Sequence, residues 1–266
     1  MKRIIVCIKP VPDPKYWAQL KIDPETKILI REGIPTILNP LDKHALEAAL
    51  QIKEKTEAEI CLVSMAPSSA VMVLREALAM GADRAFLLSD RSFSGADTLA
   101  TARVLSAGIR QIGHFDAIFC GDFSLDGSTA QVPSQVAELL NIASVCHVEA
   151  IKCCEEDNTF WVTQKIEHGD VTLRATPPIL LAVTKEINRP RHISFLEIIE
   201  ADEKEIRILD NSVLRLEPKT IGISGSPTQM ADLILRKGQR EGRIITGSLT
   251  EIVQQLTERL TQLGIL

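Results

Sequence analysis

The sequence lacks two features that would each have indicated a partner, and it has few aromatic residues. No stretch of its 266 residues approaches the roughly 20 consecutive apolar residues of a membrane-spanning helix, so membrane insertion is not expected. The formal net charge of -5 leaves no basic excess for nucleic-acid phosphates, so nucleic acid is not expected as a partner. Aromatic residues make up only 4% of the chain.

Metal-binding and catalytic motifs are also missing. None of the six cysteines forms a C-x-x-C motif, and the five histidines have no metal-ligand spacing. Cys7, Cys61 and Cys120 fall in apolar runs, where a free cysteine behaves as a small hydrophobe. No nucleophile–base pair and no pair of carboxylates stands out, so no catalytic residue is predicted. We expect a reduced, cytoplasmic protein without a metal site.

What the sequence does contain is a regular alternation of two patterns. Apolar runs at 3–9, 59–65, 85–89 and 117–120 predict buried strands. Amphipathic stretches between them predict helices at 40–52, 68–80, 97–112 and 129–141, with Asn39 and Asp97 as N-caps. This alternation predicts an α/β fold with a doubly wound, mainly parallel, Rossmann-like sheet.

The pattern changes near residue 143. Segments 145–153, 160–167 and 171–175 are rich in β-formers and predict hairpins added to the same sheet, followed by a strand at 179–184. Beyond residue 200 the strand–helix alternation ends, and the last helix, 249–263, carries an apolar face. We therefore expect a nucleotide-binding domain at 1–200 and a C-terminal arm at 201–266 that packs on a partner subunit.

Residues 115–133 (FDAIFCGDFSLDGSTAQVP) are the most informative stretch. A buried strand ends at Gly121, a loop of small residues follows, and a helix begins near Thr129. Free N–H groups at a helix N-terminus, together with the helix dipole, favour an anion there. The loop has neither a Walker lysine nor a G-x-G-x-x-G motif, so a nucleotide loop and a plain strand–helix connection both stay open.

Ligands of doubly wound sheets bind beyond the carboxyl ends of the strands. The segments expected there are 9–13, 65–67, 89–98 and 121–129. The residues by themselves thus indicate a nucleotide-binding α/β protein. Two classes remain: a redox subunit that carries a cofactor, and an adenylate-handling transferase or hydrolase.

A set of short motifs narrows this choice. They are 8–12 (IKPVP), 39–42 (NPLD) with Ala45 and Glu47, 121–133, 164–183 (QKIEHGDVTLRATPPILLAV) and 225–228 (GSPT). In this order, over essentially the whole chain, they resemble the beta subunit of electron-transfer flavoproteins. The resemblance implies an adenine-nucleotide-binding α/β fold that pairs with an alpha subunit carrying FAD.

The same resemblance implies one of two cofactors for this chain. The plain carriers hold AMP, whereas the bifurcating, anaerobe-type branch holds a second FAD that NADH reduces. Segments 89–98 and 126–132, and Asp122 where AMP-type members often have lysine, resemble the bifurcating branch. That branch sends one electron to ferredoxin or flavodoxin and the other through the alpha-subunit FAD to a flavin-dependent dehydrogenase. An adenylate-handling enzyme or nucleotide sensor is the remaining alternative.

The resemblance also implies which residues hold the cofactor. The pyrophosphate is expected on the N–H groups of Ser128, Thr129 and Ala130. The full expected set is Lys9, Pro10, Val11, Asn39, Asp42, Met65, Ala66, Asp90, Arg91, Gly95, Asp97, Thr98, Cys120, Gly121, Asp122, Ser124, Asp126, Gly127, Ser128, Thr129, Ala130, Gln131, Val132 and Pro133.

A separate loop, 188–197 (NRPRHISFLE), aligns with the segment that docks the dehydrogenase in the family. Phe195 or Leu196 would be the apolar anchor, beside Arg189 and Arg191. The alternative is that Phe195 packs against its own domain.

Overall fold

The computed structural model describes residues 3–19, 21–22, 29–30, 33–154, 157, 159–228, 242 and 244–266. These residues fall into two units, Met1–Ala231 and Asp232–Leu266. Each unit is described separately below.

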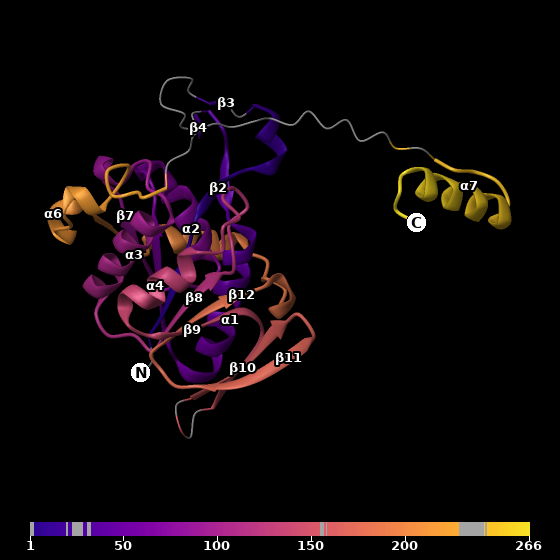
Figure 1. Ribbon diagram of the computed structural model, residues 1–266. Helices are drawn as coiled ribbons and strands as arrows, with labels where there is room; N and C mark the ends of the chain where they lie inside the picture. Colours follow the sequence, from indigo (N-terminus) through magenta and orange to yellow (C-terminus); the bar gives the residue numbers. More distant parts are fainter. Residues whose placement is uncertain are drawn as a thin grey trace. The chain divides into compact units, whose positions relative to one another are not determined.

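The first unit is built on a nine-stranded sheet with the order β11-β10-β9-β12-β8-β1-β6-β7-β13 (Figure 1). Neighbours from β9 to β13 along this order pair in parallel, whereas β9, β10 and β11 pair antiparallel as added hairpins. This confirms the predicted fold class. The strands are β1 (Arg3–Cys7), β6 (Glu59–Met65), β7 (Arg84–Leu88), β8 (Ala117–Gly121), β9 (Ala143–Cys154), β10 (Thr159–Ile166), β11 (Gly169–Ala175), β12 (Ile179–Val183) and β13 (Ile206–Leu209).

Helices cover both faces of this sheet. The helices are α1 (Pro40–Thr56), α2 (Val71–Ala79), α3 (Thr98–Ile112), α4 (Val132–Leu140), α5 (Phe195–Glu203) and α6 (Asn211–Leu214). On β1, Ile4 and Val6 face the core under α1 and α2, and Ile5 faces the core under α3 and α4. Full burial on both sides explains why this strand is a continuous apolar run.

Shorter elements connect these layers. Two-stranded ribbons are formed by β2 (Pro10–Pro12) with β5 (Thr36–Leu38) and by β3 (Lys21–Ile22) with β4 (Leu29–Ile30). The 3-10 turns are η1 (Pro14–Gln19), η2 (Ser68–Ala70), η3 (Arg91–Phe93), η4 (Lys185–Ile187) and η5 (Pro218–Thr220).

The strand order reverses at β1. The chain proceeds from β1 to β6 and β7 on one side, then crosses to β8 and β12 on the other. The carboxyl ends of β1 and β8 therefore form the topological switch point, where doubly wound sheets leave a crevice for ligands.

Most of the predicted helix ends are confirmed. Asp97 caps α3 by accepting a hydrogen bond from the Ala100 N–H (2.9 Å), and Pro40 occupies the first turn of α1. The helix expected at 129–141 instead begins at Val132. Ser128 and Ala130 have φ values of 49° and 53°, a left-handed conformation that no α-helix contains, so residues 128–131 extend the loop.

The end of the first unit differs from the expected boundary at residue 200. β13 pairs with β7, and the division between the units falls at residue 231. β13 has only Leu209 fully buried, while Arg207 and Ile208 are exposed. Ile206, Arg207 and Ile208 alternate apolar and polar residues, but a strand of four residues is too short for this alternation to predict it.

The described part of the second unit contains the helix α7 (Leu249–Gln262). Ser248 and Glu251 form a capping box at its start. Leu249, Val253 and Leu256 are among its exposed apolar side chains. No helix in the described part of the chain is long and apolar enough to cross a membrane.

Candidate functional site

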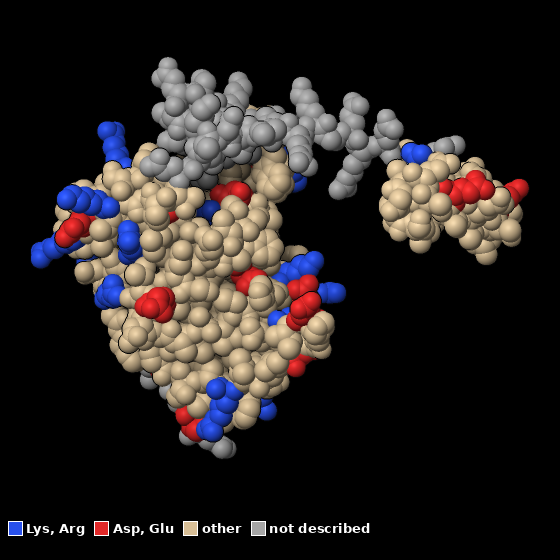
Figure 2. Space-filling model, in the orientation of Figure 1, with Lys and Arg blue, Asp and Glu red and all other residues tan. Residues whose placement is uncertain are grey.

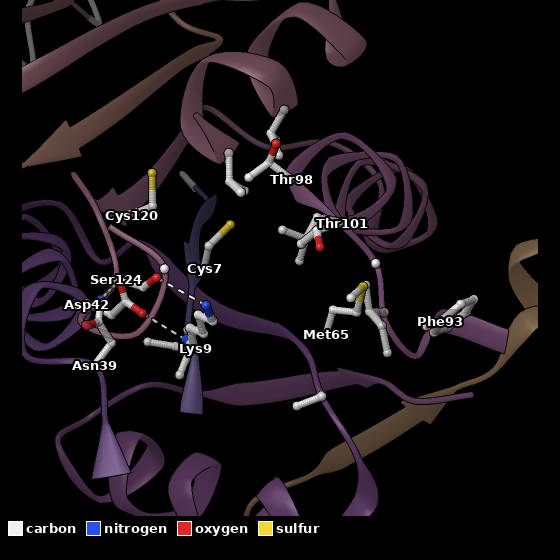
Figure 3. Close-up of a pocket in the computed structure, with 18 of the residues that line it drawn as sticks. Cys7, Lys9, Asn39, Asp42, Met65, Phe93, Thr98, Thr101, Cys120 and Ser124 are labelled. Carbon is white, nitrogen blue, oxygen red and sulfur yellow. Dashed lines mark hydrogen bonds between the residues drawn. The ribbon is translucent and has the colours of Figure 1, made fainter. Parts of the chain in front are cut away.

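A cavity of about 920 Å³ lies at the carboxyl ends of β1, β6, β7 and β8, between the first turns of α3 and α4 (Figure 3). It thus occupies the switch point of the sheet. Most of the predicted cofactor residues line it, namely Lys9, Asn39, Asp42, Met65, Ala66, Asp90, Arg91, Gly95, Asp97, Thr98, Cys120, Gly121, Asp122, Ser124, Gly127, Thr129, Ala130, Gln131, Val132 and Pro133.

Four of the predicted residues are not part of the lining. Pro10 and Val11 belong to β2, where they pair with Leu38 and Ile37 of β5, and Val11 is fully buried. Asp126 accepts a hydrogen bond from Lys9 Nζ (2.6 Å), and Ser128 donates its N–H (2.9 Å) and its Oγ (3.2 Å) to the Ser124 carbonyl. Both residues thus hold the loop after β8 in shape, and the Ser128 N–H is bound within the loop, not free for a pyrophosphate as expected.

One wall of the cavity is organised by a buried carboxylate. Asp42, in the first turn of α1, accepts hydrogen bonds from the backbone N–H groups of Lys9 (2.8 Å) and Gly121 (3.1 Å). Asn39 donates to the same carboxylate through Nδ2 (3.0 Å). The start of α1 thereby ties together the ends of β1 and β8, as Figure 3 shows for Lys9 and Asp42.

The close fit of this wall explains why position 121 is a glycine. A Cβ atom at position 121 would lie 2.6 Å from Asp42 Oδ1, so only glycine leaves room for the carboxylate. Burial raises the pKa of Asp42 to about 7, and the hydrogen bonds from Asn39, Lys9 and Gly121 offset only part of this rise.

The loop after β8 is attached to the same wall. Asn39 donates through Nδ2 to the Phe123 carbonyl (3.1 Å) and accepts the Leu125 N–H through Oδ1 (3.2 Å). Lys9 Nζ donates to Ser124 Oγ (3.1 Å) and to Asp126 Oδ1 (2.6 Å). These bonds fix the loop from both sides, and residues 128–131 then continue it to the N-terminus of α4.

The second wall is the segment 89–98, and its acidic residues have positioning roles. Asp90 accepts the N–H groups of Ser92 (2.8 Å) and Asn211 (3.0 Å), which lowers the pKa of its carboxyl. Asp97 caps α3 through Oδ1 and accepts the Thr228 N–H through Oδ2 (3.0 Å). Both carboxylates therefore hold backbone.

We name residues 217–228 the strap, because they pass over the second wall. Ser226 Oγ accepts the Asp97 N–H (2.8 Å) and donates to the Gly222 carbonyl (2.7 Å). Arg103 of α3 donates through Nη1 to two strap carbonyls, those of Thr220 and Gly225 (both 3.2 Å). At Gly222, with φ of +55°, a Cβ would lie 2.2 Å from the Ser92 carbonyl oxygen. The motif at 225–228 thus contacts the second wall without lining the cavity itself.

Part of the cavity is apolar, and sequence reasoning missed most of this part. Leu105 and Val136 line it from α3 and α4, and Leu88 and Leu180 line it from strands. Thr101, which Figure 3 shows facing the cavity, stands one helical turn after the predicted Thr98. A search for residues three or four positions after a predicted helical site residue would have found it.

A β-bulge brings His147 of β9 into contact with Asp122, which lines the cavity. Ala182 of β12 faces both Cys146 and His147 of β9, and His147 has φ of +54°. The bulge turns the imidazole so that Nδ1 lies 2.5 Å from Oδ2 of Asp122. Nothing in the sequence pattern marked His147, because bulges depend on the pairing of strands.

The residues of the predicted docking loop differ in exposure and contacts. Phe195 and Leu196 begin α5 with 76% and 70% of their surface exposed, so Phe195 does not pack against its own unit. Arg189 is also exposed. Arg191, in contrast, is bound within the chain, since its Nε contacts Glu47 (2.8 Å) and its Nη2 contacts Glu54 (2.8 Å).

Comparison with known proteins now identifies the family. Residues 26–214 match the model of the electron transfer flavoprotein domain. The chain is 44% identical to an electron transfer flavoprotein subunit beta of Thermoanaerobacterium thermosaccharolyticum, over 97% of both chains. This chain belongs to the electron-transfer flavoprotein beta-subunit family.

Two further members of the family have names that describe a complex. The subunit CarD of the caffeyl-CoA reductase-Etf complex of Acetobacterium woodii is 42% identical over 99% of this chain and 100% of its own. The acryloyl-CoA reductase electron transfer subunit gamma of Anaerotignum propionicum is 35% identical over 98% of both chains. These matches cover nearly the whole chain, so they confirm the family resemblance that the short motifs indicated.

Proposed function

We propose that this chain binds FAD in the cavity at the switch point and receives electrons from NADH. One electron would pass to ferredoxin or flavodoxin, and the other through the FAD of an alpha subunit to a flavin-dependent dehydrogenase. Two relatives of similar length are named as subunits of CoA-substrate reductase complexes, which favours such a dehydrogenase. We place this activity in the cytoplasm.

The size and the two-part lining of the cavity carry the proposal. Its volume of about 920 Å³ is near the upper end of the roughly 300–1,000 Å³ typical of small-molecule sites. A polar end is formed by the loop after β8, and an apolar part is lined by Leu88, Leu105, Val136 and Leu180. FAD carries a pyrophosphate between two aromatic ring systems, so it matches a polar loop beside an apolar part, and it fills a cavity of this size better than AMP, which has one ring and one phosphate.

The residues present suit such a ligand. Loop residues 127 and 129–131 line the cavity before the start of α4, and their backbone N–H groups would bind a pyrophosphate. Thr98 Oγ1 donates to Gln131 Oε1 (2.8 Å), so these two side chains connect the starts of α3 and α4 at the edge of the cavity that both residues line. A bound flavin would itself supply hydride acceptance and single-electron transfer. The chain's own residues would bind the cofactor, orient it and exclude water from it. No acid–base pair is needed for this role, which agrees with the lack of a predicted one.

Two surfaces are suited to the proposed protein partners. Exposed Phe195 and Leu196, with Ile199 one turn later on α5, form a small apolar patch for the dehydrogenase. The apolar face of α7 would pack on the alpha subunit, as we proposed for the arm. On the face in Figure 2, acidic and basic side chains lie in small mixed groups, unlike the broad basic surface that binds nucleic acid.

The deciding measurement is the ligand content of the complex of this chain with its alpha subunit. Ligands released by denaturation would be identified by mass. Two equivalents of FAD per alpha–beta pair, without AMP, are expected. One FAD and one AMP would contradict the proposal and leave this chain with a structural nucleotide.

A filling variant tests where the second FAD lies. Thr101→Trp would occupy the apolar part of the cavity, and we expect it to remove one FAD equivalent while leaving AMP able to bind. Gln111→Trp, on the exposed side of the same helix, is the matched control and should keep both equivalents. Retention of both FAD equivalents in Thr101→Trp would place the flavin elsewhere.

A further inference from the structure

Two cysteines stand side by side at the switch point. Ile4, Ile5 and Val6 of β1 pair with Ala117, Ile118 and Phe119 of β8, so the next position brings Cys7 beside Cys120. Adjacent strands lie about 4.8 Å apart, and paired residues of parallel strands point to the same face. That separation falls within the roughly 4.4–6.8 Å between Cα atoms at which two cysteine side chains can be joined.

Both thiols face the cavity. Cys7 is half-buried and Cys120 is buried, and both line the cavity (Figure 3). Burial raises the pKa of Cys7 to about 12 and holds the pKa of Cys120 well above its usual range, and the neighbouring Cys7 adds to the rise at Cys120. Both side chains are therefore neutral thiols at physiological pH, and reagents that need a thiolate react with them slowly.

We propose that Cys7 and Cys120 form a two-thiol site for a trivalent arsenical at the floor of the cavity. With phenylarsine oxide, two S–As bonds form, the As=O bond is lost, and the two thiol protons leave with the oxygen as water. Arsenic stays trivalent and sulfur is not oxidised, so no oxidant is needed. Holding two thiols at one site favours a reagent that binds both at once.

The chain contains its own control pair. Cys153 and Cys154 are consecutive in β9, and consecutive strand residues point to opposite faces of the sheet. Neighbours in the sequence are thus separated by the fold, while Cys7 and Cys120, far apart in the sequence, are brought together. A reagent that needs two thiols distinguishes the pairs.

The test treats the full chain, freed of nucleotide, with one equivalent of phenylarsine oxide and measures its mass. The wild type and the Cys153→Ser/Cys154→Ser variant should each gain the mass of one phenylarsine oxide less one water. Cys7→Ser and Cys120→Ser should lose this gain. Because a serine variant can misfold, the labelled wild type is also digested, and the peptides containing Cys7 and Cys120 should be recovered joined by arsenic. An unlabelled wild type, or arsenic joined to other cysteines, overturns the site.

A second arm adds excess FAD before the reagent, and this arm rests on the proposed function. If FAD occupies the cavity, it should prevent the mass gain. Labelling of Cys7 and Cys120 that FAD and AMP leave unchanged would contradict a nucleotide in this cavity and leave the two-thiol site established. The two-thiol site and the proposed nucleotide site are therefore contradicted by different results.

Discussion

The two walls of the cavity are held by different kinds of contact. The first wall depends on the buried side chains of Asn39 and Asp42, which bind the ends of two central strands. The second wall depends on the strap, whose residues lie 129 and 131 positions after Asp97 in the sequence. The first wall is part of the sheet itself, so it cannot change without cost to the fold. The second is clamped from outside and can change while the sheet stays intact.

The largest effect is expected at the first wall. Asp42→Ala would leave the N–H groups of Lys9 and Gly121 and the amide of Asn39 without their acceptor in a buried site. Since each such loss costs about 1–3 kcal/mol, we expect the free energy of unfolding in urea to fall by several kcal/mol. A loss no larger than that of an exposed-residue control, such as Asp202→Ala, would show that Asp42 does not hold this wall.

The same residue predicts a pH dependence. Its pKa is raised from 3.8 to about 7 in the folded chain. A carboxyl that is harder to ionise when folded contributes most to stability below pH 3.8, and this contribution is lost as the pH rises towards 7. The stability of the wild type relative to Asp42→Asn should therefore decrease between about pH 4 and pH 7, measured by urea unfolding at each pH. A difference that is constant over this range would contradict the raised pKa.

A smaller effect, confined to the second wall, is expected from Gly222→Ala. Its Cβ would collide with the Ser92 carbonyl, whereas Gly33, with φ of +77°, has no atom within 4 Å of the added carbon. Both substitutions should lower the free energy of unfolding by roughly 1–2 kcal/mol, because alanine disfavours a left-handed backbone. Gly222→Ala alone should also weaken nucleotide binding, measured by calorimetry. Equal nucleotide affinity of the two variants would show that the strap does not influence ligand binding in the cavity.

The smallest effect is expected for Ser226→Ala. It removes the hydrogen bonds to the Asp97 N–H and the Gly222 carbonyl, at a cost of about 1 kcal/mol. Nucleotide affinity should fall modestly, and the pH dependence assigned to Asp42 should stay unchanged. Ser212→Ala serves as control, because Ser212 is an exposed residue of α6 whose Oγ donates to the N-cap residue Asp210. A changed pH profile in Ser226→Ala would show that the two walls are coupled.

The two walls also differ in how far the sequence predicted them. Apolar runs revealed the central strands, because a strand buried on both faces needs them, and the strand ends then located the cavity. The role of Asp42 was invisible, since its acceptor function depends on strands that meet only in the folded chain. The helix α4 begins three residues later than predicted, because Ser128 and Ala130 have left-handed backbone conformations. Helix propensities do not predict such a positive φ value. β13 and the bulge at His147 depend on pairing partners, which one sequence does not display.

The carboxylate of Asp42 also has a consequence for the order of folding. Its two backbone donors lie 33 and 79 positions away, so the first strand and helix can pack during synthesis long before the second donor has left the ribosome. The pocket closes only when β8 joins β1, which makes it a late step with a high loop-closure cost. The amide protons of Lys9 and Gly121 then become reporters of that step, because their exchange with deuterium measures the opening of this wall. A nucleotide bound in the cavity, as we propose, would slow this exchange.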